Sequence, residues 1–142
     1  MAKPIPKLRY DEISTGDEAP VLSHKLDRND LVAYAGASGD FNPMHSNEFA
    51  AQAAGLPSVF GHGMFSMGFL ARAITDWAGV GNLTEYRVRF TKQTWPGEEL
   101  TTRVVVTGKE DAGDGKRIQL DVTLANQDGE SKLAGSATVV AS

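Results

Sequence analysis

The sequence predicts an α+β fold in which an antiparallel sheet wraps around one long buried central helix. Two observations lead to this expectation. The stretch from Met64 to Ala78 is mostly apolar at helical spacing, and its polar residues gather toward its C-terminal end. After Asn82 the apolar residues recur with a period of two, which is typical of half-buried strands. A helix and a sheet of this kind bury their apolar faces against each other.

Length and composition agree with one globular unit, and we expect a single domain over residues 1–142. The chain is 41% hydrophobic and 23% charged, which excludes a disordered or membrane-spanning chain. A net charge of -4 argues against a nucleic-acid partner. The absence of cysteine excludes a disulfide framework and a thiolate nucleophile. The N-terminus has positive charge but no apolar run, so we expect a cytoplasmic protein that does not bind membranes.

The first half of the chain contains signals for two short helices after an extended arm over residues 1–20. Asp27 is suited to cap the first helix, with the carboxylate of Asp30 in its first turn. The glycines between positions 36 and 39 should end it. A second helix is expected from after Ser46 to Gly55. The loop over residues 40–45 therefore lies between two expected helices.

The second half should consist of the long helix and four strands. We expect the helix to be buried nearly all round, because apolar residues cover both of its faces. Glycine-containing turns between the last three strands favour hairpins, so the strands should form an antiparallel meander. The four expected strands are residues 86–90, 100–106, 117–124 and 132–140.

A first segment that could carry chemistry is the loop Asp40-Phe-Asn-Pro-Met-His45. Its carboxylate and imidazole are five residues apart, and together they could manage a proton. The alternative is a turn begun by Asn42-Pro43, in which Asp40 bonds backbone amides and His45 is ordinary loop polarity. The loop alone does not decide between the two.

A second segment is Phe60-Gly-His-Gly-Met64, where two glycines flank His62 at the start of the long helix. Glycine allows a substrate to approach the backbone closely. The free amides of a first helical turn are suited to stabilising negative charge on a carbonyl oxygen. The alternative is a glycine-rich turn that leads into a core helix, with His62 packed and hydrogen-bonded.

Together these segments resemble the MaoC-like, or R-specific enoyl-thioester hydratase, family of the hot dog fold. The resemblance covers most of the chain: Asp40–His45, an alanine-rich segment, and His62–Met64 heading an apolar helix follow the family's order and spacing. Tyr86–Phe90 resembles the strand that follows the helix. The fuller pattern, which includes Tyr34–Gly39, is similar to that of mycobacterial-type 3-hydroxyacyl carrier-protein dehydratase subunits. Some members place a serine one turn into the helix, where this chain has Gly68.

The resemblance implies a hydro-lyase of fatty acid metabolism that interconverts trans-2-enoyl and (3R)-3-hydroxyacyl thioesters. It implies that Asp40 and His45 jointly hold a catalytic water, and that the backbone amide of Gly63 binds the thioester oxygen. Asn42 and His62 are the further residues expected to bind substrate or to help form the oxyanion site. The substrate would be carried by CoA or by acyl carrier protein, and the reaction requires no cofactor.

Other functions remain open at this level. A hot dog acyl thioesterase would use a carboxylate-activated water on the same kind of ligand. A non-catalytic subunit of a heteromeric dehydratase would only bind the acyl chain. The joint presence of Asp40 and His45 argues against both. We expect a homodimer, or a heterodimer with a related hot dog subunit, because an exposed sheet edge favours pairing.

A metal site built from histidines is also conceivable. The three histidines, together with Asp40, supply enough nitrogen and oxygen ligands for one ion. They show none of the close helical spacings of known ligand motifs, however. We therefore expect no metal. The histidines concerned are His24, His45 and His62.

Overall fold

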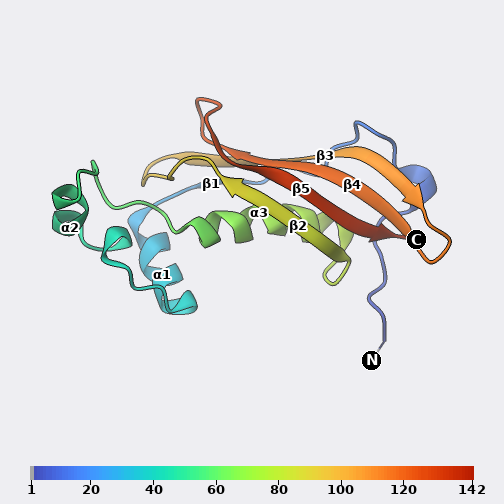
Figure 1. Cartoon of the computed structure of the whole chain (residues 1–142), viewed down its shortest axis with the longest axis horizontal. Coiled ribbons are helices and arrows are strands. Elements are labelled where there is room, and N and C mark those ends of the chain that lie inside the picture. Colours follow the sequence, from blue (N-terminus) through green and yellow to red (C-terminus); the bar gives the residue numbers. More distant parts are fainter. Residues whose placement is uncertain (1) are drawn as a thin grey trace.

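The computed structural model describes residues 2–142 and shows helices packed against one antiparallel sheet (Figure 1). The long helix lies against one side of the sheet, and two shorter helices extend beyond one end of it. In chain order the elements are η1 (Tyr10–Glu12), β1 (Ser23–Lys25), α1 (Arg28–Ser38), η2 (Pro43–His45), α2 (Glu48–Ala53), α3 (Gly63–Ala78), β2 (Leu83–Phe90), β3 (Glu99–Asp111), β4 (Lys116–Ala125) and β5 (Ser131–Ala141).

The strand order β1-β3-β4-β5-β2 differs from the expected four-strand meander in two ways. A short fifth strand, β1, pairs with β3, and β2 pairs with β5 instead of the next strand in sequence. The hairpins β3-β4 and β4-β5 agree with the expectation. After β2 the chain crosses over to β3, two strands beyond β5 in the sheet, so β2 is left as an edge strand. Gly135 permits this contact, because an added Cβ would lie 1.8 Å from the carbonyl oxygen of Arg87.

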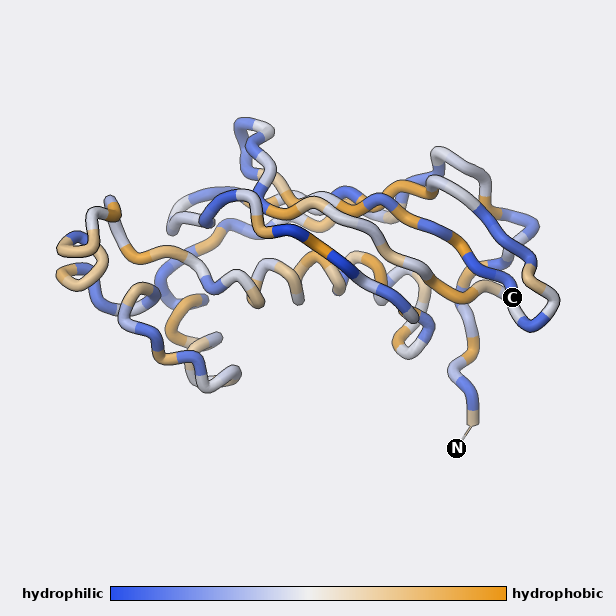
Figure 2. Tube along the Cα trace, in the orientation of Figure 1, coloured by the Kyte–Doolittle hydropathy of each residue, from blue (hydrophilic) through white to orange (hydrophobic). Residues whose placement is uncertain are grey.

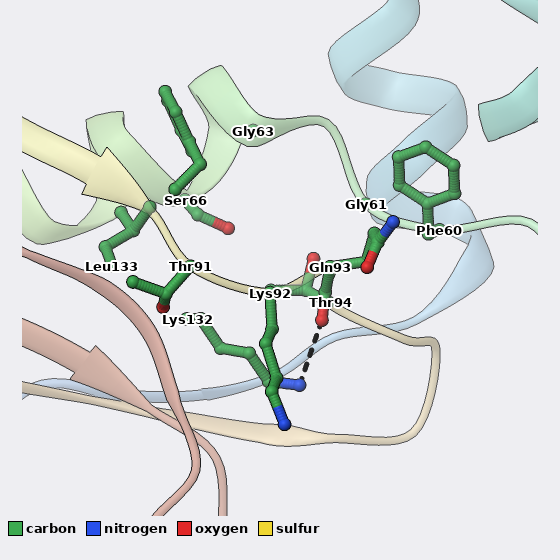
Figure 3. A pocket seen from close by; sticks show the side chains of 11 residues that line it. Phe60, Gly61, Gly63, Ser66, Thr91, Lys92, Gln93, Thr94, Lys132 and Leu133 are labelled. Atoms are coloured by element: carbon green, nitrogen blue, oxygen red, sulfur yellow. Dashed lines mark hydrogen bonds between the residues drawn. The ribbon is translucent and has the colours of Figure 1, made fainter.

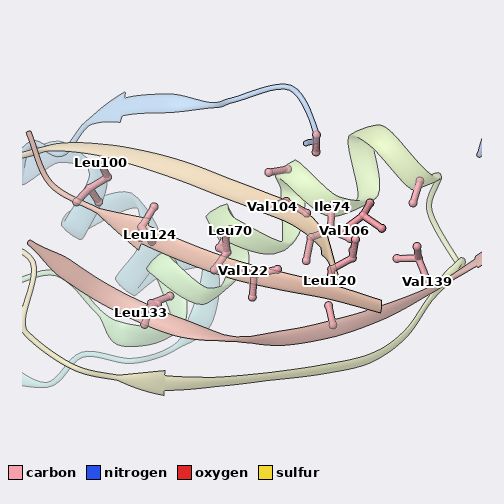
Figure 4. Packing of buried hydrophobic residues seen from close by; sticks show 14 of the residues in the cluster. Leu70, Ile74, Leu100, Val104, Val106, Leu120, Val122, Leu124, Leu133 and Val139 are labelled. Carbon is pink, nitrogen blue, oxygen red and sulfur yellow. The ribbon is translucent and has the colours of Figure 1, made fainter. Parts of the chain in front are cut away.

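The core lies between α3 and the concave side of the sheet (Figure 4). Alternate residues of β3 and β4 are buried, as a period of two requires, and apolar and polar stretches alternate along the strands in Figure 2. Each leucine or isoleucine fully buried here contributes about 1.5–3 kcal/mol of hydrophobic free energy. The buried side chains in contact include Leu70, Ile74, Leu100, Val104, Val106, Ile118, Leu120, Val122, Leu124 and Leu133.

The expectation that the long helix is buried nearly all round is wrong. Leu70 and Ile74 are fully buried, whereas Met64 is 56% exposed and Gly68 is also exposed. The physical reason is that the sheet covers one face of α3 and leaves the other uncovered (Figure 1). The Tyr86 hydroxyl on β2 donates to the carbonyl of Met67 at 2.8 Å, and burial raises the pKa of Tyr86.

The local signals of the first half are confirmed. The Asp30 amide donates to the Asp27 carboxylate and the Asp27 amide to the Asp30 carboxylate, both at 2.9 Å, which forms a capping box. Helix α1 runs through Gly36 and ends at Gly39, whose φ of 76° is left-handed. No helix within residues 2–142 has the length and apolar character needed to cross a membrane.

Candidate active site

The segment Phe60–Gly63, which we call the lead-in segment, connects to two different parts of the chain. On one side, the Phe60 amide donates to the carbonyl of Met44 at 3.2 Å. On the other, the Gly61 amide donates to the carbonyl of Thr94 at 2.8 Å. The start of α3 therefore lies between a loop from the first half of the chain and the connection between β2 and β3.

The Asp40–His45 loop is held by short-range bonds. The Asn42 amide donates to the Asp40 carboxylate at 3.2 Å, and the Asn42 side chain accepts from the Met44 amide at 3.1 Å. These are the turn bonds that short Asp and Asn side chains favour. The Asp40 side chain remains 50% exposed. The loop thus presents a carboxylate from a locally stabilised backbone.

His45 faces this carboxylate with a defined nitrogen. Its Nδ1 lies 2.7 Å from the carbonyl oxygen of Phe60. A carbonyl only accepts hydrogen bonds, so Nδ1 carries the proton and the neutral ring has its lone pair on Nε2. Nε2 lies 3.9 Å from Oδ2 of Asp40, which is too long for a direct hydrogen bond. One water molecule can contact both groups across such a distance.

His62 contacts both ends of the same loop. Its Nε2 donates to the backbone carbonyl of Asp40 at 3.1 Å, and its ring stacks on His45 with centroids 3.9 Å apart. Burial lowers the pKa of His62, so the ring is neutral near pH 7. Nδ1 has no hydrogen-bond partner among the described residues. The hydrogen bond and the ring stacking of His62 together fix the Asp40 backbone relative to the His45 ring.

Gly63 is the first residue of α3, and the His62 cap provides no side-chain bond to the first turn. Its amide is one of those that a helix leaves without an intrahelical acceptor. Gly63 lines a cavity of about 270 Å³, shown in Figure 3. A Cβ at this position would lie 2.9 Å from Cε1 of Phe90. Gly63 is itself exposed, so a ligand in the cavity can reach its backbone.

The structure thus brings Asp40, His45 and His62 together, with one ligand-type atom from each within 4.8 Å of the others. Such a group could hold a metal ion by its chemistry, although two of its imidazole nitrogens already bond carbonyl oxygens. His24 does not join this group, since it pairs with Asp30 at 2.7 Å. The cavity at Gly63 is not lined by any of the three.

Gly68, where the resemblance implies a serine in some family members, does not line the cavity at Gly63. It lines a groove together with Tyr34, Phe65 and Phe69. A Cβ added at Gly68 would meet no atom within 4 Å. The position is therefore open to a larger side chain.

Sequence reasoning missed three residues that line the cavity at Gly63: Ser66, Thr94 and Lys132. Lys132 is fully buried, and its Nζ donates to the carbonyl of Gln93 at 2.9 Å. Ser66 had a signal, because it is the one polar side chain in the otherwise apolar first half of α3. Thr94 and Lys132 had none, because their contacts join distant segments.

Comparisons with known proteins identify the family of the chain. The family model described as MaoC like domain matches residues 13–127. The chain is 42% identical over 79 residues to 3-hydroxyacyl-thioester dehydratase Y of Mycobacterium tuberculosis, covering 53% of this chain and 27% of that protein. It is 32% identical over 101 residues to the (R)-specific enoyl-CoA hydratase of Rhodospirillum rubrum, covering 70% of this chain and 69% of that protein.

The structure also superimposes on the solved R-hydratase PhaJ1 from Pseudomonas aeruginosa in its unliganded form. The TM-score is 0.81 at 26% identity, over 96% of this chain and 87% of that one. The chain spans only 27% of the length of the mycobacterial dehydratase. It spans 69% of the length of the Rhodospirillum rubrum hydratase and 87% of PhaJ1. Because the family model covers most of the sequence and the fold agrees with the hot dog hydratases, the chain belongs to the MaoC-like domain family.

Proposed function

We propose that the protein is a hydro-lyase that interconverts trans-2-enoyl and (3R)-3-hydroxyacyl thioesters in fatty acid metabolism. The observation that carries this proposal is the pairing of Asp40 Oδ2 with the unprotonated Nε2 of His45, 3.9 Å apart. The names of the similar proteins, an (R)-specific enoyl-CoA hydratase and a 3-hydroxyacyl-thioester dehydratase, support the same reaction.

In the hydration direction, the water molecule lies between Asp40 and His45. It loses a proton to this pair, for which Nε2 of His45 has an available lone pair. The water oxygen forms a bond to C3, the electrons of the C2–C3 double bond form a C1–C2 double bond, and the carbonyl π electrons move onto the thioester oxygen to give an enolate. The pair then returns a proton to C2, which completes the addition. Dehydration follows the same steps in reverse.

The amide of Gly63 would bind the thioester oxygen while it carries negative charge. A donor held in position at such an oxygen contributes about 3 kcal/mol to transition-state stabilisation. Asn42 would keep the loop in its active conformation through its bond to the Met44 amide. His62 would do the same through the Asp40 carbonyl.

Pairing with a second hot dog subunit is part of this proposal. Strand β2 is an eight-residue sheet edge, whereas the opposite edge, β1, has three residues. An unpaired edge of that length favours joining to another strand. We expect two copies, or one copy and a related subunit, to associate through β2. Light scattering should give twice the monomer mass, and a proline in place of Val88 should lower it.

The first experiment follows the loss of enoyl-thioester absorbance with crotonyl-CoA and longer trans-2-enoyl-CoA substrates. Asp40→Asn and His45→Ala should each lower turnover by roughly 10²–10⁴-fold, as expected for loss of a general acid-base group. Asp76→Asn is the matched control, because this carboxylate is exposed and pairs with Arg72 on the surface. It should leave turnover unchanged.

Four further results separate the alternatives. Release of free thiol without formation of a hydroxyacyl product would indicate a thioesterase. Turnover that the Asp40 and His45 substitutions do not reduce would contradict the assigned roles. Activity that appears only when a related subunit is added would indicate a partner-dependent enzyme. Chiral analysis of the product should yield the 3R alcohol.

A further inference from the structure

The cavity beside Gly63 contains two buried hydroxyl groups that the proposed reaction does not use. Ser66 is 2% exposed and Thr94 is 4% exposed. Neither hydroxyl oxygen has a hydrogen-bond partner among the described residues. Both residues line the cavity, and Figure 3 shows the Ser66 hydroxyl directed into it. Buried hydroxyls are normally hydrogen-bonded, so this pair indicates a place for a polar ligand group.

The charges around the cavity are neutralised within the protein. Nζ of Lys132 lies 2.9 Å from Oε2 of Glu98 and 2.8 Å from Oε1 of Glu130. Lys92 also pairs with Glu130, at 2.9 Å. The cationic groups of the lining are therefore already paired with carboxylates. A neutral polar group fits this environment better than a phosphate.

The position of the hydroxyls relative to Gly63 suggests which group this is. Ser66 lies three residues after Gly63 on α3, and positions at this spacing share one helix face with about 5–6 Å between their Cβ positions. In thioesters of CoA and of carrier proteins, a sulfur and two methylene groups separate the thioester carbonyl from the first amide of the pantetheine arm. Four single bonds of this kind span roughly 5 Å when extended.

We infer that Ser66 and Thr94 bind the first amide of the pantetheine arm while Gly63 binds the thioester oxygen. A hydroxyl both donates and accepts, so the pair can serve the amide N–H and its carbonyl. The inference rests on the proposed function, because that function supplies the thioester. It assigns the cavity to the carrier arm that CoA and carrier proteins share.

The test measures binding, so it does not depend on turnover. Two saturated probes are compared by protein-observed NMR titration: butyryl N-acetylcysteamine thioester, which has the amide, and S-butyl thiobutyrate, which lacks it. Wild-type protein should bind the first probe more tightly. Ser66→Ala and Thr94→Val should each weaken only that probe, by about fivefold, as expected for one lost hydrogen bond. Thr75→Val removes a hydroxyl near the far end of α3 and should change neither value.

Three results would overturn the inference. Equal affinity of wild-type protein for both probes would show that the amide is not recognised. An equal loss for both probes in the variants would show that the hydroxyls act on another part of the ligand. Unchanged affinities in both variants would exclude the two residues. Selective binding of the amide probe without hydration of its crotonyl counterpart would instead contradict the proposed reaction and leave the inference standing.

Discussion

Two segments contact the lead-in segment of α3 from opposite sides, the Asp40–His45 loop (the exposed wall) and residues 91–98 (the buried wall), and they are stabilised differently. The Asp40–His45 loop has turn bonds between residues two or three positions apart, and its carboxylate is half exposed. It is also joined to the lead-in segment by bonds to Phe60 and His62. The opposite wall, residues 91–98, is fixed by the fully buried Lys132 from β5 and by Glu98, which accepts from the Asn126 side chain at 2.6 Å. The proposed roles place chemistry on the Asp40–His45 loop and substrate binding on the side of residues 91–98.

The comparison shows why one short chain can combine both tasks. The half-exposed carboxylate of Asp40 can be reached by a water molecule. A binding wall must instead keep its shape when a ligand replaces water, which a network of buried charges and hydrogen bonds provides. The two walls contact each other through the lead-in segment, so damage to either should have distinct effects on stability and activity.

The largest expected effect is on the buried wall. Lys132→Met should lower the free energy of unfolding by about 3–5 kcal/mol, because the largely buried Glu98 carboxylate loses its charged partner. Lys92→Met is the matched control, since Lys92 is 59% exposed and pairs with the same Glu130. Lys92→Met should cost much less stability than Lys132→Met, because solvent screens an exposed ion pair. Urea unfolding measures both, and equal losses would contradict the difference between buried and exposed pairs.

A smaller effect should follow from crowding the contact between the walls. A Cβ at Gly61 would lie 2.2 Å from Oγ1 of Thr94. Gly61→Ala should therefore destabilise the protein by about 1–3 kcal/mol, as overpacking does. Adding Thr94→Ala should restore most of that loss, because the clashing hydroxyl is removed. If the double variant is no more stable than the single one in thermal unfolding, the steric explanation fails.

A substitution in the Asp40–His45 loop should lower the activity of the protein more than its stability. Asn42→Ala removes the bond to the Met44 amide and should cost about 1 kcal/mol, as loss of a cap does. Hydration should slow because the spacing of Asp40 and His45 is no longer maintained. Asn47→Ala removes the corresponding bond to the Ala50 amide in α2. That control should lose similar stability in urea unfolding but keep its turnover.

The smallest effect concerns pH and the histidine between the walls. Burial lowers the pKa of His62 below its ordinary value of 6.5, so the unfolded chain binds more protons. The stabilisation is complete above that value and is lost as pH falls through the lower, folded-state pKa. One such proton changes the unfolding free energy by at most about 1 kcal/mol between about pH 7.5 and pH 6. His62→Gln should flatten this slope in urea titrations, and an unchanged slope would assign it to other groups.

Features encoded within a few neighbouring residues could be predicted from the sequence alone. The apolar period of α3, the β3-β4-β5 hairpins and the Asp27 capping box all follow from local patterns. The short Asn-Pro turn between Asp40 and His45 belongs to this class, but the orientation of these two side chains also depends on bonds to Phe60 and His62. Their roles in catalysis stay predictions until the variants are assayed.

The tertiary structure decided what depends on segments far apart in the chain. The strand β1, the placement of β2 beside β5 and the exposed face of α3 all arise from how the sheet closes on the helix. The contact of Lys132 with Gln93 joins residues 39 positions apart. Such contacts depend on loop closure and on many small packing energies. Residues that meet in this way have no local pattern, so only the folded chain brings Thr94 and Lys132 to the cavity beside Ser66.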